Sequence, residues 1–402
     1  MNKAAQAFKR NQLLTSKDES GGGTYRIGEI AGDGIGPEVI DEARKCMNVV
    51  AELYGFDLHF EKFDLGADHY LATGELIDEK TLMDLRGQDA ILLGAVGDPR
   101  VNSGVLERGL ILKIRGAFVQ SVNVRPARLI PGVTSPIRNL TPERYNVVIV
   151  RENTEGMYVG GGSLAHEGTP WAVAVQQSIS TNLAVSRTVR FAFDLAVRRR
   201  GHVTLCHKTN VLTEAGKVWL DAFDEVAISY PDVTHNYLHV DACCVHLLER
   251  PEQFDVIVTE NLFGDILSDL TAGIQGGLGL APSGNINLTG DAPSMFEPVH
   301  GSAPDIVGTG RAHPGGAIFA GAMLLGHLGE LEAACSIEQA LISVLGSQGG
   351  PSDGLRHRST QEIGQMTIDE IRRHGDTTQW DMSGFSATAI SSSVLVNEST
   401  PS

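Results

Sequence analysis

The chain has 402 residues, of which 42% are hydrophobic and 20% are charged, which is the composition of a globular protein of two or three structural units. Its 32 basic and 49 acidic residues give a net charge of −17, which disfavours nucleic acid as a partner because phosphate backbones bind to basic surfaces. The longest apolar runs fall short of the ~20 residues of a membrane span, and the five cysteines show no CxxC pairing. We therefore expect a cytoplasmic protein with reduced thiols and no membrane contact.

Both ends of the chain are expected to be flexible. Residues 1–23 are polar and finish in Ser-Gly-Gly-Gly. Residues 383–402 are rich in Ser and Thr and have no helical periodicity. The folded part is therefore expected between these two segments.

Strand-like and helix-like segments alternate through the rest of the chain. A strand at 25–31 leads into a Gly-rich turn at 32–36 and a helix that begins at Pro37. Further strands are predicted at 58–63, 90–93, 147–150, 203–206, 235–240 and 256–259, and further helices at 183–199, 213–228 and 316–329. Residues 171–177 alternate with period two and are expected in a smaller domain or an arm. The pattern favours an α/β architecture with an at least partly parallel sheet.

The Gly-rich turn has two interpretations. It follows a strand and precedes a helix, as a dinucleotide-binding turn does. Its spacing is G-x-G-x-G, however, rather than G-x-G-x-x-G, and the next strand lacks a well-placed acidic residue for a ribose. The alternative is a tight turn whose glycines let the helix pack closely on the strand.

Three arginines stand near apolar segments: Arg115, Arg125 and Arg151. Arg151 directly follows the predicted strand at 147–150, and the carboxyl ends of strands in open α/β sheets form ligand crevices. Three guanidinium groups converging there would suit a small di- or tricarboxylate. The alternative for each arginine is an ion pair on the surface.

Two aspartates, Asp265 and Asp269, lie four residues apart in a segment that predicts a helix. At this spacing they share one face, and two carboxylates so close together favour a hard cation such as Mg²⁺ or Mn²⁺ between them. Asp241, after the predicted strand at 235–240, is a third candidate ligand. The alternative is that Asp265 caps the helix. Tyr158 and Lys208, taken singly, are compatible with surface or packing positions.

Six segments, in this order, resemble one family: the NAD(P)-dependent β-decarboxylating dehydrogenases of isopropylmalate, isocitrate, homoisocitrate, malate and tartrate. The segments are GDGIGPEV at 32–39, NVRP at 123–126, RENTEG at 151–156, KTNVL at 208–212, NLFGDILSD at 261–269 and EPVHGSAPDI at 297–306. The resemblance covers roughly residues 25–375. The last two segments are long and specific, so the resemblance outweighs the alternative interpretations of the single residues.

The resemblance implies a role for each candidate residue. The matching residues that bind the malate core are Arg115, Arg125 and Arg151, with Asp241. The matching ligands of a divalent metal, Mg²⁺ or Mn²⁺, are Asp241, Asp265 and Asp269. Tyr158 and Lys208 match the catalytic acid and base. The residues that match the NAD-binding loops are Glu297, His300, Gly301, Ser302, Ala303, Pro304, Asp305, Ile306 and His313, the last standing where most members have an adenine-contacting asparagine.

The resemblance also implies an architecture. The family fold is α/β with a large mixed sheet flanked by helices in two intertwined domains, and it is not a Rossmann fold. The nucleotide-binding domain is expected at 24–125 and 278–382, and the substrate, metal and dimerisation domain at 126–277. In the family the lysine and one aspartate come from the neighbouring subunit, so Lys208 and Asp241 imply a homodimer with shared active sites.

The substrate is expected to carry an apolar substituent. Isocitrate-specific members place Ser and Asn six and four residues before the first substrate arginine, where this chain has Gly109 and Ile111. Leu112 and Val211 would complete an apolar patch. A third carboxylate against this patch would be unpaired, whereas burial of an isopropyl group there is favourable. The expected reaction is the NAD-dependent oxidative decarboxylation of (2R,3S)-3-isopropylmalate to 4-methyl-2-oxopentanoate, a step of leucine biosynthesis.

Two alternatives remain at this point. One is a sister enzyme for D-malate, tartrate or another 3-substituted malate, which differs in the volume beside the apolar patch. The other is a catalytically silent regulatory subunit, which would be expected to lack metal-binding or acid–base residues that this chain retains. Asp305 matches the family's acidic residue that accepts hydrogen bonds from the adenine-ribose hydroxyls, which implies NAD rather than NADP.

Overall fold

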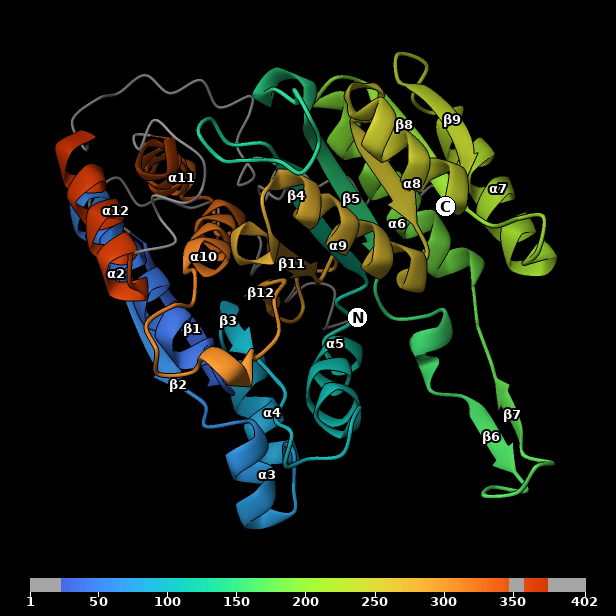
Figure 1. Cartoon of the computed structure of the whole chain (residues 1–402), viewed down its shortest axis with the longest axis horizontal. Helices are drawn as coiled ribbons and strands as arrows, with labels where there is room; N and C mark the ends of the chain where they lie inside the picture. The colour runs from blue at the N-terminus through green and yellow to red at the C-terminus, as the bar shows by residue number, and fades with distance from the viewer. Residues whose placement is uncertain (1–22, 347–357, 375–402) are drawn as a thin grey trace, which may run out of the picture.

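The computed structural model describes residues 23–346 and 358–374 of the chain (Figure 1). The predicted flexible ends, 1–23 and 383–402, lie outside the described residues apart from Gly23. None of the helices in the described ranges is both long and apolar enough to cross a membrane. All five cysteines lie in the described ranges, and none of them forms a disulfide bond there.

A ten-stranded sheet runs through the molecule in the order β2-β1-β3-β12-β11-β4-β5-β10-β8-β9. Its strands are β1 (Thr24–Gly32), β2 (Asp57–Lys62), β3 (Ala90–Ala95), β4 (Val122–Arg128), β5 (Asn146–Glu152), β8 (His202–His207), β9 (Thr234–His239), β10 (Val256–Thr259), β11 (Pro282–Ile286) and β12 (Ser294–Pro298). β11 is antiparallel to β12 and to β4, and β4 is antiparallel to β5, whereas the other neighbours are parallel. The predicted α/β fold with a large mixed sheet is thus confirmed.

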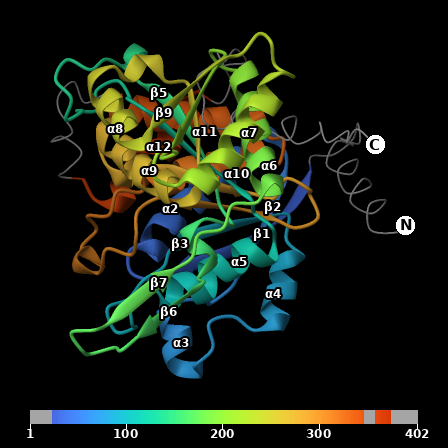
Figure 2. The same ribbon diagram turned by 90° about the vertical axis from the view of Figure 1, so that its right-hand side faces the viewer.

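A separate hairpin of β6 (Gly162–Ala165) and β7 (Val173–Gln176) projects from the body in both views (Figures 1 and 2). The predicted strand at 171–177 therefore belongs to an arm. Its apolar side chains are exposed in the described structure, and Trp171, which precedes β7, is 75% exposed.

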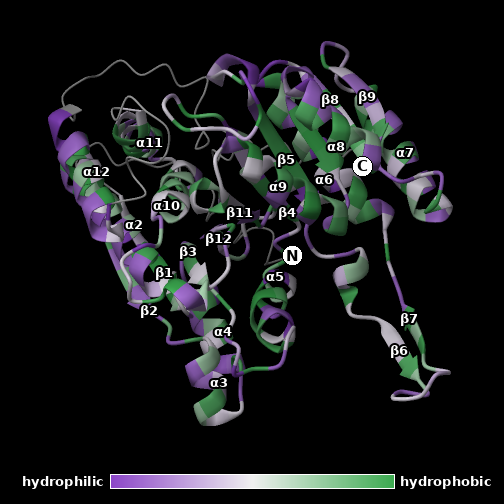
Figure 3. Ribbon diagram, in the orientation of Figure 1, coloured by the Kyte–Doolittle hydropathy of each residue, from purple (hydrophilic) through white to green (hydrophobic). Residues whose placement is uncertain are grey.

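Helices cover both faces of the sheet. They are α2 (Gly36–Tyr54), α3 (Ala67–Thr73), α4 (Glu79–Arg86), α5 (Leu112–Ala117), α6 (Asn182–Val197), α7 (Thr213–Ala227), α8 (Val240–Glu249), α9 (Asn261–Gln275), α10 (Gly315–His327), α11 (Leu331–Gly346) and α12 (Thr360–His374), and a π-helical turn η1 (Glu107–Ile111) precedes α5. One face packs on α2, α6, α7, α10, α11 and α12 in one continuous core. α10 and β5 are largely hydrophobic in Figure 3.

The other face carries two separate apolar cores. One joins β1 and β3 to α4 and α5, and the other joins β5 and β10 to α8 and α9. Side chains alternate along a strand, so Val148 and Val150 of β5 enter the continuous core while Val147 and Ile149 enter the α8–α9 core. Arg151, next in the second series, therefore points to the divided face. Between the two cores lies a set of buried polar residues, here called the polar strip: Asn123, Arg125, Arg151, Ser283, Asn285 and Glu297.

The Gly-rich turn between β1 and α2 is a point of close backbone packing. A Cβ at Gly32, which has φ +71°, would lie 2.0 Å from the carbonyl oxygen of Ala95, and one at Gly34 would lie 2.0 Å from that of Ser302. Ile35 N donates a hydrogen bond to the same Ser302 oxygen at 2.9 Å. A Cβ at Gly36, where α2 begins, would lie 2.2 Å from the carbonyl oxygen of Ala31 in β1. The glycines thus let the helix pack closely on the strand, as the alternative interpretation held, and they also allow close contact with the loop that contains Ser302.

Candidate active site

All residues of the polar strip except Arg151 are joined by hydrogen bonds into one network across the central strands. Arg125 Nε donates to Asn123 Oδ1 at 2.7 Å, and Asn123 Nδ2 donates to Asn285 Oδ1 at 2.9 Å. Asn285 Nδ2 donates to Glu297 Oε1 at 2.9 Å, and the same oxygen accepts from Arg115 Nη2 at 2.9 Å. Buried polar groups are tolerated when they are paired in this way. The network thus links two of the predicted substrate arginines, Arg125 and Arg115.

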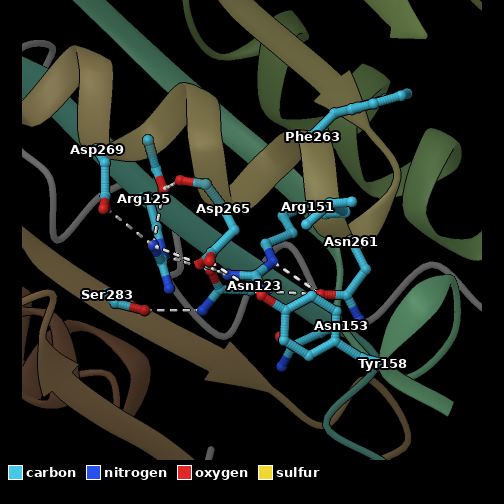
Figure 4. Close-up of polar contacts among 12 residues, drawn as sticks. Asn123, Arg125, Arg151, Asn153, Tyr158, Asn261, Phe263, Asp265, Asp269 and Ser283 are labelled. Carbon is cyan, nitrogen blue, oxygen red and sulfur yellow. Dashed lines mark hydrogen bonds and ion pairs between the residues drawn. The ribbon is translucent and has the colours of Figure 1, made fainter. Parts of the chain in front are cut away.

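The three predicted arginines are all buried, with 7%, 8% and 1% of Arg115, Arg125 and Arg151 exposed, so the interpretation as surface ion pairs is wrong. Figure 4 shows Arg125 and Arg151 facing Asp265. Arg151 Nη1 lies 2.5 Å from Asp265 Oδ1, and Arg125 Nη1 lies 3.5 Å from the same oxygen. Burial, and after it the nearby Arg151, lowers the pKa of Arg125 to about 10. The guanidinium is still charged at neutral pH and needs anionic partners.

Asp265 and Asp269 lie on α9, one turn apart, and both face Arg125 (Figure 4). The interpretation of Asp265 as a helix cap is wrong, because Glu260 caps α9 by accepting from the backbone N–H groups of Leu262 and Phe263. Burial would raise the pKa of Asp265, but the adjacent Arg151 and Arg125 outweigh it and hold this pKa below its ordinary value. Burial raises the pKa of Asp269, and Asp265 adds to the rise.

Gly264 lets α9 approach Arg151. A Cβ at this position would lie 2.5 Å from Arg151 Cγ and 2.7 Å from Arg151 Cβ. Because Arg151 is fully buried, its side chain has little room to move away. We expect Gly264→Ala to destabilise the protein by about 1–3 kcal/mol, as overpacked core substitutions do. Gly273 is the matched control, because it is exposed on the same helix and its Cβ would meet nothing within 4 Å.

Chemical denaturation of both variants measures the difference. Gly273→Ala should stabilise by about 0.5–1 kcal/mol, since alanine favours a helix interior. Equal stability changes in the two variants would contradict the packing argument.

Tyr158 lies in a short 3₁₀ turn, η3 (Met157–Val159), beside the arginines. Its hydroxyl donates to Asp265 Oδ2 at 2.9 Å, and the Arg151 guanidinium lies over its ring, 5.2 Å from the ring centre. Burial is the main reason that the pKa of Tyr158 lies above its ordinary value. The phenol is therefore protonated at neutral pH and can act as a proton donor.

Lys208 and Asp241 form a second, separate group. Lys208 follows β8, Asp241 lies in the first turn of α8, and Lys208 Nζ donates to Asp241 Oδ1 at 2.7 Å. The described ranges contain no group of three or more His, Cys, Asp or Glu residues that could hold a metal ion. Asp241 is thus not brought to Asp265 and Asp269 to form such a group within one chain.

The predicted apolar patch is placed in two parts. Ile111 and Leu112 are half-buried at the start of α5, four and three residues before Arg115, so they lie on the same face of the helix as this arginine. Val211 lies in the segment after Lys208 and is 66% exposed. The contact between the two parts remains a prediction.

Most of the predicted NAD-binding residues lie in the loop that follows β12, and Glu297 lies in β12 itself. Glu297 is ion-paired with Arg115, and Ser302 is braced by the Gly-rich turn. Ala303 has φ +39°, a strained conformation for a residue with a Cβ and one that is concentrated at functional sites. Asp305, in the 3₁₀ turn η6 (Pro304–Ile306), is exposed. The remaining predicted residues of this loop are Gly301, Pro304 and Ile306.

Two predicted NAD-binding histidines, His300 and His313, flank this loop. His300 Nε2 is buried and has no hydrogen-bond partner in the described structure, so it is a polar atom that a ligand could satisfy. His313 Nδ1 accepts a hydrogen bond from Gly315 N at 3.0 Å, at the start of α10. Burial lowers the pKa of His313 to about 4, so this nitrogen is free to accept at neutral pH.

Sequence analysis missed the polar residues that position the arginines. Asn153 Nδ2 donates to Asn285 Oδ1 at 2.9 Å, and Ser268 Oγ accepts from Arg125 Nη1 at 2.7 Å. Asn261 Oδ1 accepts from Arg151 Nε at 2.9 Å (Figure 4). Asn123 and Ser283 belong to the same group. These residues could have been recognised in the sequence as polar residues that stand within otherwise apolar strands or directly beside the acidic pair.

The fold is α/β, and the site pairs buried arginines with carboxylates of the same chain. A family model described as isocitrate/isopropylmalate dehydrogenase matches residues 26–367. The chain therefore belongs to the isocitrate/isopropylmalate dehydrogenase family, which confirms the resemblance found in the sequence.

Individual relatives agree with this assignment. The 3-isopropylmalate dehydrogenase of Thermobifida fusca (strain YX) is 49% identical over 353 residues, which are 88% of this chain and 99% of the relative. The 3-isopropylmalate dehydrogenase of Nocardia farcinica (strain IFM 10152) is 50% identical over 84% of this chain and 98% of its own length. The crystal structure of isocitrate dehydrogenase from Methylococcus capsulatus has a TM-score of 0.77 and 34% identity, covering 87% of this chain and 99% of its own.

Proposed function

We propose that this enzyme converts (2R,3S)-3-isopropylmalate to 4-methyl-2-oxopentanoate and CO₂ with NAD as the hydride acceptor and Mg²⁺ or Mn²⁺ as the metal. The observation that carries the proposal is that the polar strip lies next to an apolar helix face. Arg115, which is paired with Glu297 of the strip, stands one helical turn from Ile111 and Leu112. The two relatives named 3-isopropylmalate dehydrogenase, at 49% and 50% identity, support the same substrate. A cytoplasmic location, the two-domain division and the leucine pathway belong to this proposal.

Charge balance supports a dianionic substrate with a divalent cation. Three buried arginines face three carboxylates of their own chain, those of Glu297, Asp265 and Asp269. These six charges cancel, and a malate dianion with a divalent cation adds no net charge. The arginines would bind the substrate carboxylates, and Asp265 and Asp269, with Asp241 from a second subunit, would hold the cation through hard oxygen ligands.

The chain supplies the acid and the base. Lys208 would accept the proton of the 2-hydroxyl group, Arg115, Arg125 and Arg151 would hold the carboxylates in place, and Tyr158 would give its proton to C3 after CO₂ has left. When bound, NAD would take the hydride from C2, and the metal would lower the pKa of the 2-hydroxyl and stabilise the negative charge on the same oxygen. The network through Asn285 would keep Arg115 and Arg125 fixed during these steps, and Asn261 and Asp265 would do the same for Arg151.

NAD binding is proposed at the loop that contains the unpartnered His300 nitrogen and the strained Ala303. Asp305 would accept hydrogen bonds from the adenine-ribose hydroxyls. A 2′-phosphate at this place would meet a carboxylate, and such a contact between like charges costs several kcal/mol, or roughly a hundredfold or more in kcat/KM.

We therefore expect kcat/KM for NAD to exceed that for NADP by at least this factor. Asp305→Lys should reduce the ratio by about 10- to 100-fold, and Asp305→Asn, which removes only the repulsion, should have a smaller effect. Steady-state kinetics with both cofactors measures the ratios. A preference of the unmodified enzyme for NADP would refute the role of Asp305.

A homodimer with shared sites is proposed from the separation of the two catalytic groups. Lys208 and Asp241 pair with each other rather than with the Asp265 group. Apolar side chains are exposed on α8 and α9, including Val245, Leu248 and Ile266, and on the β6–β7 hairpin. A second copy of the chain would cover these surfaces and bring Lys208, Asp241 and Val211 to the polar strip.

A further inference from the structure

Tyr237 of β9 lies beside the segment that carries Lys208. Its hydroxyl is 3.2 Å from the carbonyl oxygen of His207, to which it can donate. It accepts a hydrogen bond from Thr209 N at 3.2 Å and lies 2.9 Å from Thr209 Oγ1. It also lies 2.7 Å from His239 Nδ1. One hydroxyl group therefore contacts the residues on both sides of Lys208.

These contacts lie where the strand pairing ends. The parallel ladder of β8 and β9 finishes at the pair His207 and His239. Beyond it the chain turns, and the backbone N–H groups of Val211 and Leu212 both donate to the carbonyl oxygen of Lys208. Tyr237 supplies a partner to Thr209 N at the start of this turn, so the backbone is held on both sides of the lysine.

The same hydroxyl connects Lys208 to its acidic partner. His239 is the residue that precedes α8, and Asp241 lies in the first turn of this helix. The Tyr237–His239 contact thus joins the lysine segment to the beginning of the helix that carries Asp241. The Lys208–Asp241 ion pair, at 2.7 Å, spans the two segments that the hydroxyl joins.

We propose that Tyr237 is a positioning residue for Lys208 and Asp241. Its hydroxyl fixes the backbone of the base relative to α8, so that the Lys208 side-chain nitrogen and the Asp241 carboxylate reach the active site of the second subunit as one rigid unit. The inference rests on the proposed function, in which Lys208 is the base. Small displacements of a reacting group cost large factors in rate, about 10²-fold for roughly 1 Å, so the hydroxyl is expected to act on kcat.

The test is Tyr237→Phe in the full-length enzyme, assayed with isopropylmalate, NAD and Mn²⁺. We expect kcat to fall by about 10- to 100-fold, with KM for NAD changing by less than about threefold. Tyr230→Phe is the matched control, because it removes a hydroxyl that donates to Asp194 Oδ1 at 2.6 Å, away from the Lys208 segment. Tyr230→Phe should keep kcat within about twofold, and an equal loss in both variants would overturn the proposal.

A double-mutant cycle separates positioning from general structural damage. In a Lys208→Ala background, which has no base to position, Tyr237→Phe should lower kcat by a clearly smaller factor than in the unmodified enzyme, because only its effect on Asp241 remains. Fully multiplicative effects would overturn the proposal, as would an unchanged kcat in Tyr237→Phe itself. Thr209→Val, which removes only the side-chain oxygen near the same hydroxyl, provides a milder variant and should lower kcat in the same direction if Tyr237→Phe does not fold.

The proposed function fails in a different way. If Lys208→Ala kept the unmodified kcat, the role of the lysine would be wrong, whatever Tyr237→Phe did. If Lys208→Ala lost activity while Tyr237→Phe kept it, the lysine would remain the base and only the positioning role would be wrong.

Discussion

(2R,3S)-3-Isopropylmalate should be oxidised with a kcat/KM at least about a thousandfold higher than that of isocitrate, because a buried unpaired carboxylate costs several kcal/mol and each 1.36 kcal/mol is a factor of ten. The helix turn before Arg115 offers Ile111 and Leu112 to a third carboxylate rather than hydrogen-bond donors. Malate, which lacks the C3 substituent, should be slower than isopropylmalate by roughly ten- to a few-hundredfold, the scale of a lost apolar group in a pocket.

Substitution of the apolar face should narrow this preference. Ile111→Asn together with Gly109→Ser would supply donors to a third carboxylate. A Cβ at Gly109 would lie 1.9 Å from Leu76 Cδ1, so Leu76→Ala is included to make room. The triple variant should reduce the isopropylmalate-to-isocitrate ratio by about 10- to 100-fold, since a hydrogen bond to a charged group contributes about 1.5–3 kcal/mol.

The measurement is kcat/KM for a panel of 3-substituted malates, malate, tartrate and isocitrate. Leu53→Asn is the matched control, because Leu53 is exposed on α2, which packs on the other face of the sheet, and the ratio should not change. Isocitrate equal to isopropylmalate in the unmodified enzyme would refute the pocket argument. A preference for D-malate or tartrate would leave the catalytic residues in place and would favour the alternative substrate.

Strands were predictable from the sequence where an uninterrupted apolar run marks them. The apolar run at 256–259 predicted β10, which is Val256–Thr259, because a buried parallel strand is apolar on both faces. β11 (Pro282–Ile286) and β12 (Ser294–Pro298) were not predicted. They contain Ser283, Asn285 and Glu297 of the polar strip, and these residues interrupt the apolar pattern.

The site was predictable only in part, because sequence patterns report local structure and not which distant strands pair. Arg151 was recognised because it follows an apolar strand, and Asp265 and Asp269 because their spacing places them on one helix face. Asn285, by contrast, acts through Asn123, from which it is separated by 162 positions in the sequence. Its role depends on the antiparallel pairing of β11 with β4, which brings these two residues opposite each other and which no local pattern contains.

Mixing two inactive variants should restore activity if the site is shared between subunits. Tyr158→Phe and Lys208→Ala should each lower kcat by about 10²- to 10⁴-fold, the usual contribution of a general acid or base. In a heterodimer one site would carry both substitutions, while the other would combine an intact Tyr158 with an intact Lys208. With random exchange half of the dimers are mixed and half of their sites are intact, so about a quarter of the unmodified activity should return.

The matched control mixes Tyr158→Phe with Asp265→Asn. The Tyr158 hydroxyl donates to Asp265 Oδ2 within the same chain, so both residues belong to the same half of the site. Every site of this heterodimer would lack one of them, and no activity should return. Subunit exchange is measured in parallel by co-purification of two differently tagged variants. Full exchange without recovery in the Tyr158→Phe and Lys208→Ala mixture would mean that Lys208 serves the site of its own chain, because every site would then carry one of the two substitutions.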